Sequence, residues 1–148
     1  MKENIWINIL EANKLMRSPD EVTAFENALA SLADRPQDED LPDLHLILDD
    51  RCEQPEVMFG LIHFLESFDV FAQMQAFVTV VPQLMLVASE WTRILHTRIL
   101  NDDDACRLYR DILHYSLNTQ EPNFVRQLLE ESASYHLNKR EPKLELAR

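Results

Sequence analysis

The chain has 148 residues, of which 46% are hydrophobic and 27% are charged, a composition typical of one globular domain rather than of a disordered segment. Acidic residues outnumber basic residues by 26 to 14, and the formal net charge of −12 disfavours direct binding to nucleic acid or to an anionic membrane surface. The two cysteines, Cys52 and Cys106, lie far apart in the sequence, which argues against a disulfide framework and a thiolate metal site.

Glycine and proline usage predicts an all-α fold. Gly60 is the only glycine, so the sequence lacks the residues on which tight hairpins and phosphate-binding loops depend. Proline suits the first turn of a helix, because its missing N–H would have no partner there. Five of the seven prolines precede apolar stretches of helical spacing and indicate helix starts: Pro19, Pro42, Pro55, Pro82 and Pro122.

The first half of the chain contains three predicted helices before residue 50. The first carries an apolar stripe formed by Ile5, Ile9 and Ala12. The second begins at the Ser18-Pro19-Asp20-Glu21 sequence, in which Ser18 can cap the helix and Glu21 can complete a capping box. A polar loop then leads to a short helix opened by Pro42.

The middle of the chain contains three further predicted helices. An acidic loop leads to a helix that begins at Pro55 and ends near Ser67. Asp69 can cap the next helix. Pro82 then either begins or kinks the longest helix, which runs to about Leu100 with an apolar face.

Residues 101–104 supply a helix stop and acidic residues for the positive end of the following helix, and Pro122 opens the last one. The total is about eight short helices in antiparallel pairs, either as a compact bundle or as a short HEAT-like α-solenoid. We expect a single all-helical domain over residues 1–137 and a polar C-terminal tail over residues 138–148.

The sequence contains none of the common catalytic strings. There is no Gly-x-Ser-x-Gly, no His-Glu-x-x-His and no phosphate-binding loop, and the five histidines lie on separate predicted helices or at their ends. We therefore predict a non-enzymatic protein with no cofactor and no metal. On the helix after Pro55, one face carries Phe59, His63 and Glu66, which indicates either a second packing face or a recognition face.

The carboxylates are concentrated between Asp34 and Glu56, where nine of them stand against two arginines and give a local charge of −7. Because this segment joins helices, we expect its carboxylates to face outward and to attract a basic protein. We predict a partner-binding surface, with apolar anchoring by Phe59 or by Trp91, although the apolar neighbours of Trp91 favour the core. Its residues are Asp38, Glu39, Asp40, Asp43, Asp49, Asp50, Glu53, Glu56, Phe59, His63, Glu66, Asp69, Asp102 and Asp103.

Three segments resemble the immunity protein 30 family, one of the all-helical bacterial immunity families encoded beside polymorphic or contact-dependent inhibition toxins. They are Leu46-Ile47-Leu48-Asp49-Asp50, the stretch from Glu56 to Asp69, and Glu90-Trp91 followed by Arg98-Ile99-Leu100-Asn101. The resemblance extends from Val22 to about Leu129. It implies a protein that binds and blocks a cognate toxin domain, often a nuclease with a basic substrate groove, without a reaction of its own.

Two other functions fit the same residues. A helical adaptor or scaffold in a regulatory complex would share the fold and the acidity, and an enzyme with an unrecognised carboxylate or histidine site is the third alternative. No apolar run approaches the roughly 20 residues needed to span a bilayer, and the amino-terminal residues do not form a secretory signal. We therefore expect a cytoplasmic protein without membrane or nucleic-acid partners, whose self-association the sequence does not reveal.

Overall fold

The computed structural model describes residues 4–119, and this part of the chain is all-α, as the sequence predicts. The predicted helix after Pro122 and the predicted boundary at residue 137 lie outside these residues. The described elements, in chain order, are α1 (Ile5–Asn13), α2 (Pro19–Asp34), the 3-10 helix η1 (Asp38–Asp40), α3 (Leu41–His45), α4 (Pro55–Glu66), α5 (Val70–Val87), α6 (Ser89–Asn101) and α7 (Asp103–Thr119).

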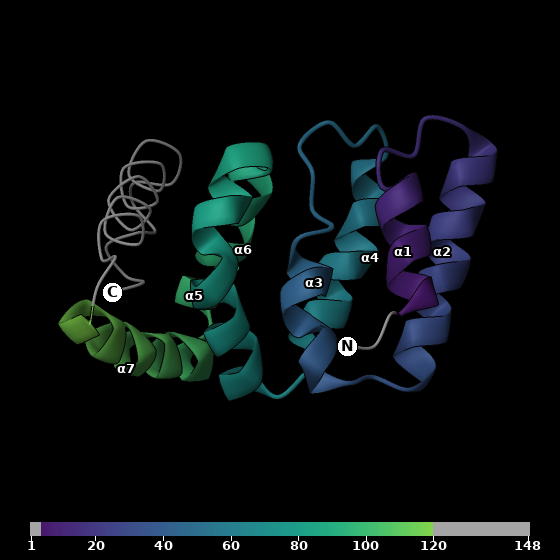
Figure 1. Ribbon diagram of the computed structural model, residues 1–148. Helices are drawn as coiled ribbons and strands as arrows, with labels where there is room; N and C mark the ends of the chain where they lie inside the picture. Colours follow the sequence, from purple (N-terminus) through teal and green to yellow (C-terminus); the bar gives the residue numbers. More distant parts are fainter. Residues whose placement is uncertain (1–3, 120–148) are drawn as a thin grey trace.

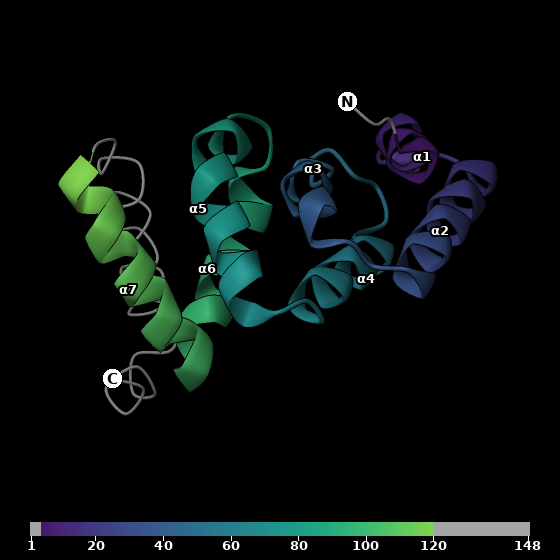
Figure 2. The same cartoon turned by 60° about the horizontal axis from the view of Figure 1, so that its bottom comes forward.

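The helices follow one another in a row of antiparallel pairs, which resembles a short stack more than a bundle around one axis (Figure 1). α1, α3 and α5 form one layer, and α2, α4 and α6 form the other (Figure 2). Contacts within the pairs join α1 to α2, α3 to α4 and α5 to α6, while α2–α4 and α3–α5 contacts join successive pairs. α7 packs against both α5 and α6 at the end of the row.

Local signals account for most of the helix starts. The Ser18 hydroxyl accepts a hydrogen bond from the Glu21 N–H (3.2 Å), and the Glu21 carboxylate accepts one from the Arg17 N–H (2.7 Å) rather than from Ser18. The Asp69 carboxylate caps α5 by accepting from the Ala72 N–H (3.0 Å). Pro19, Pro42 and Pro55 lie in the first turns of α2, α3 and α4, as predicted.

The prediction of one long helix from Pro82 to about Leu100 is wrong. Pro82 lies inside α5, and the chain breaks instead at Ala88, whose φ of −142° and ψ of 46° are not helical. Proline removes one hydrogen bond from a helix interior, and the packing of α5 against α3, α6 and α7 compensates for that loss. Leu84 and Leu95, which the predicted long helix would place on one apolar face, are instead buried on two different helices.

The predicted apolar stripe on the first helix is also wrong. Ile5 is 63% exposed and Ala12 is exposed, whereas Ile7 and Leu10 are buried. α1 carries apolar side chains around most of its circumference, so spacing alone permits more than one buried face. Its contact with α2 selects the face that carries Ile7 and Leu10.

α5 lies at the centre of the molecule and is the most apolar helix of the described residues. Its 18 residues have a mean hydropathy of 1.6, so by length and composition it is the one helix among residues 4–119 that could cross a membrane. Buried helices of folded domains pass the same test. Because Met74, Phe77 and Val81 are buried against neighbouring helices, we interpret α5 as a core helix.

A buried aromatic cluster surrounds Phe77, whose ring contacts His45, His96 and Tyr109 at centroid distances of 6.1, 6.3 and 6.1 Å. The Nδ1 atom of His45 lies 2.8 Å from the Leu41 carbonyl oxygen, while its Nε2 atom and the Tyr109 hydroxyl have no hydrogen-bond partner within residues 4–119. Burial lowers the pKa of His45 from 6.5 to about 4 and raises the pKa of Tyr109. The core therefore holds His45 in its neutral form at neutral pH.

The first prediction concerns this histidine. Because the folded-state pKa of His45 is lower than the unfolded value, protonation favours the unfolded chain, and stability falls as the pH drops from 6.5 through about 4. We expect His45 to account for a loss of about 3 kcal/mol in the free energy of unfolding over that interval. Urea unfolding of wild type and His45→Leu at pH 7 and pH 4 measures it. An equal pH dependence in both proteins would contradict the prediction.

Candidate functional site

The alternating helix directions place the connections on two opposite edges of the row (Figure 1). We call upper edge the side with the α1–α2 loop, the α3–α4 loop and the α5–α6 turn. The lower edge is the side with the α2–α3, α4–α5 and α6–α7 connections. The acidic segment predicted from the sequence as one surface is divided between these two edges, because α3 runs from one to the other.

Asp49, on the upper edge, does not face solvent, so the expectation that its carboxylate faces outward is wrong. Its side chain is 1% exposed. It accepts hydrogen bonds from the Arg51 backbone N–H (2.9 Å) and guanidinium (3.0 and 2.9 Å), and Lys14 Nζ lies 3.4 Å from Oδ2. The Arg51 side chain lowers the pKa of Asp49 from 3.8 to about 2. Asp49 therefore joins the α1–α2 and α3–α4 loops.

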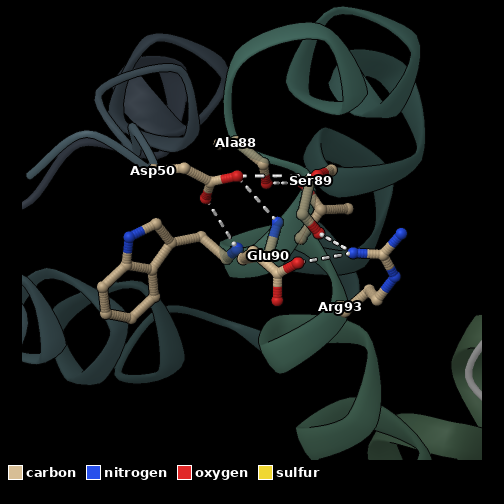
Figure 3. Close-up of polar contacts among 7 residues, drawn as sticks. Asp50, Ala88, Ser89, Glu90 and Arg93 are labelled. Atoms are coloured by element: carbon tan, nitrogen blue, oxygen red, sulfur yellow. Dashed lines mark hydrogen bonds and ion pairs between the residues drawn. The ribbon is translucent and has the colours of Figure 1, made fainter. Parts of the chain in front are cut away.

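Asp50 is exposed, but its carboxylate caps the start of α6 (Figure 3). It accepts hydrogen bonds from the backbone N–H groups of Glu90 (3.0 Å) and Trp91 (3.2 Å), and the Ser89 hydroxyl lies 3.5 Å away. Its own N–H donates to the Val87 carbonyl (3.1 Å). The N-cap residue of α6, Ala88, has no capping side chain, so Asp50 supplies the cap from 40 positions earlier in the chain.

The second prediction follows from this cap. We expect Asp50→Ala to lower the free energy of unfolding by about 1–2 kcal/mol, because two backbone N–H groups lose a charged acceptor. Glu53→Ala is the matched control, since Glu53 is an exposed carboxylate in the same loop, and its effect should stay within about 0.5 kcal/mol. Chemical denaturation measures both. Equal effects of the two substitutions would show that Asp50 is not a cap.

The rest of the upper edge carries charges of both signs. Glu53 and Glu56 are exposed as predicted. The cations of this edge are each in an ion pair: Lys14 with Glu11 and Asp49, Arg17 with Glu21, Arg51 with Asp49, and Arg93 with Glu90. This pairing reduces the field that the upper edge can present to a partner.

The lower edge brings together eight of the predicted residues, from three connections. Asp38, Glu39 and Asp43 are exposed, and Asp40 is half-buried and accepts a hydrogen bond from the Asn4 amide (3.2 Å). The other four come from two further connections. Glu66 ends α4 and Asp69 caps α5, while Asp102 and Asp103 lie at the start of α7. The described arginines on this edge are Arg35, Arg98 and Arg107. Arg98 pairs with Glu66, and Arg107 pairs with Asp104.

Three grooves lie at the lower edge, two of them beside the 38–40 turn. One of about 530 Å³ separates this turn from α5 and α7, and another of about 460 Å³ separates it from α1 and the end of α2. The third, of about 370 Å³, lies among the ends of α4 and α6 and the starts of α5 and α7. Acidic residues therefore line a surface that is hollowed rather than flat.

The apolar side chains exposed on this edge differ from those predicted. Trp91 is 6% exposed and packs edge-on against the half-buried Phe59 at a centroid distance of 5.2 Å, so Trp91 belongs to the core. His63 is exposed on α4, 6.2 Å from the ring of Phe59. Two exposed aromatic residues were not predicted as site residues: Trp6 (40% exposed) and Phe71 (46% exposed), on the first turns of α1 and α5. The signal that could have found them is an aromatic residue next to a helix cap.

The described histidines, cysteines and carboxylates do not gather into a metal site. Among residues 4–119 no group of three or more of these side chains could hold a metal ion. The lower edge offers chemistry of another kind, since it combines exposed carboxylates, grooves and two exposed aromatic rings. Such a surface can attract a basic protein over distance and then hold it by apolar contacts.

Comparison with known proteins identifies one family. The model of the family described as "Immunity protein 30" matches residues 12–109, which is more than half of the chain. The matched region contains α2 to α6 and the first part of α7, and therefore most of the lower edge. Searches of the curated proteins and of the solved structures found no match.

Proposed function

Because this chain belongs to the immunity protein 30 family, we propose that it binds a cognate toxin domain through its lower edge and blocks that toxin without any reaction of its own. The toxin in this proposal is a basic protein, a nuclease whose cationic groove normally holds a nucleic acid, and the encounter takes place in the cytoplasm. The acidic lower edge covers that groove and denies it substrate.

The observation that carries this proposal is a difference between the carboxylates of the two edges. On the upper edge, Asp49 and Asp50 are engaged in structural contacts. On the lower edge, Asp38 and Glu39 are exposed beside a groove, and Asp43 is exposed on the same edge. Since exposed acidic surface accelerates encounter with a basic protein, the lower edge is the better supported docking face.

Apolar contacts are needed for slow dissociation, because charge mainly affects the association rate. Trp6 lines the 460 Å³ groove beside Asp34 and Asp40. Phe71 follows Asp69 on the first turn of α5. Exposed aromatic rings surrounded by polar residues are common centres of binding energy at protein interfaces, and these two would anchor the toxin.

Co-expression tests the proposal. The product of the gene adjacent to this one is expressed in bacteria with and without the full-length chain, and growth and co-purification are scored. We expect the chain to restore growth and to co-purify with the toxin at a fixed ratio. A toxin that still arrests growth in the presence of the folded chain would contradict the proposal. Growth restored without co-purification would favour catalytic removal of the toxin or its product.

A further inference from the structure

The 370 Å³ groove of the lower edge has a lining of mixed character. Four helices contribute to it, namely the end of α4, the start of α5, the end of α6 and the start of α7. Val70, Met74, Ile99 and Ala105 provide apolar surface, and Glu66, Gln73, Arg98, Asn101 and Asp102 provide polar groups. We call this groove the Gln73 pocket.

Gln73 is the unusual member of this lining. Its side chain is buried, with only 4% exposure, although glutamine is mostly found at the surface. Its backbone N–H donates to the Asp69 carbonyl (2.9 Å), but no hydrogen bond joins its side-chain amide to any of the described residues. The amide nitrogen and oxygen of Gln73 are not among the fully buried unpaired polar atoms of residues 4–119, so they keep contact with solvent at the pocket, where a ligand can reach them.

The charges around Gln73 favour a cationic ligand. Arg98 donates to Glu66 through both Nε (2.6 Å) and Nη2 (2.9 Å), so the cation of the pocket is already neutralised by a bidentate pair. Asp102 uses Oδ1 to accept from the Ala105 N–H (3.0 Å), which leaves Oδ2 as an acceptor. Gln73 and Asn101 also line the pocket, and their amide groups offer two more acceptor oxygens.

We propose that the Gln73 pocket receives one arginine side chain of the toxin, whose guanidinium group donates to Gln73, Asn101 and Asp102 while its aliphatic stem lies against Met74 and Ile99. Arginine fits better than lysine because its five N–H donors in a planar fork match several separate acceptors. This inference rests on the proposed function and extends it, since it names the side chain that the lower edge recognises.

The first arm of the experiment uses small probes on the full-length chain. N-acetylarginine amide is titrated into ¹⁵N-labelled protein, and N-acetylcitrulline amide, which has the same shape without the charge, is the control. We expect a saturable shift of the Gln73 side-chain NH₂ resonances, identified by their absence in Gln73→Met, with the arginine probe alone. No saturable shift with the arginine probe, or equal shifts with both probes, would overturn the proposal.

The second arm uses the toxin itself. Gln73→Met keeps the side-chain length and removes the amide, and it should fold because the amide makes no hydrogen bond to the described residues and methionine suits a largely buried position. Gln83→Met, at an exposed glutamine of the same helix, is the matched control. We expect Gln73→Met to weaken toxin affinity about tenfold and Gln83→Met to leave it unchanged.

The outcomes separate this inference from the proposed function. If wild type and Gln73→Met bind the toxin equally, the pocket does not recognise an arginine, while the proposed function stands. If the wild-type chain does not bind the toxin at all, the proposed function fails and this inference fails with it.

Discussion

Replacing Asp49 with alanine should lower the free energy of unfolding by about 2–3 kcal/mol, the largest stability effect that we expect from one carboxylate in this chain. The substitution removes a buried acceptor of the Arg51 N–H and guanidinium and separates Lys14 from its ion-pair partner in the next loop. Urea unfolding followed by circular dichroism measures the loss.

Two further variants separate the contributions at this site. Asp49→Asn keeps an acceptor for the Arg51 N–H and should cost less than Asp49→Ala. Arg51→Ala should also cost less than Asp49→Ala, because the backbone N–H at position 51 and Lys14 still face the Asp49 carboxylate after the guanidinium is removed. A loss in Arg51→Ala as large as that in Asp49→Ala would contradict this account of the site.

The pH dependence provides an independent check. The folded-state pKa of Asp49 is about 2, below its usual 3.8, so its stabilising contribution is complete above pH 3.8 and is lost as the pH falls through about 2. His45 acts over the higher interval from 6.5 to 4. Asp49→Asn should therefore flatten the stability profile only below about pH 4.

Reversing the charge of Asp38 and Glu39 together should slow toxin association about tenfold at low salt, the largest effect on the association rate that we expect. Both side chains are exposed beside the 530 Å³ groove. Asp38→Lys with Glu39→Lys replaces attraction by repulsion on the approach to a basic partner. Stopped-flow association at several salt concentrations measures the rate and its salt dependence.

The matched control changes the same amount of charge on the other edge. Glu53→Lys with Glu56→Lys also reverses two exposed carboxylates, but on the upper edge. We expect this pair to alter the association rate less than threefold, because it lies outside the docking face. If both pairs slow association equally, net charge rather than the lower edge controls the encounter.

Much of the fold could be predicted because its signals are local. The caps at Ser18 and Asp69 and the prolines at the starts of α2, α3 and α4 lie within a few residues of the helices they define. The break at Ala88 could not be predicted in this way. Its cap is Asp50, and a contact between residues 40 positions apart leaves no periodic trace in the sequence.

The candidate site was predictable in composition but not in arrangement. The prediction placed carboxylates on one surface because they lie close together in the chain, whereas in the structure the direction of each helix decides which edge a carboxylate lies on. Asp43 and Asp49 are near neighbours in sequence but belong to opposite edges, and Asp102 joins the edge of Asp43 from a distant segment. Gln73 carried no signal, because α5 contains three glutamines and their positions in the sequence do not reveal which of them is buried.

The most direct test of the docking face is hydrogen–deuterium exchange of the full-length chain, free and in complex with the toxin. We predict that binding slows exchange in residues 35–43, 67–72 and 101–106 of the lower edge. Residues 14–18 and 49–54 of the upper edge should exchange at the same rate in both states. Protection confined to the upper-edge loops, with none on the lower edge, would contradict the account.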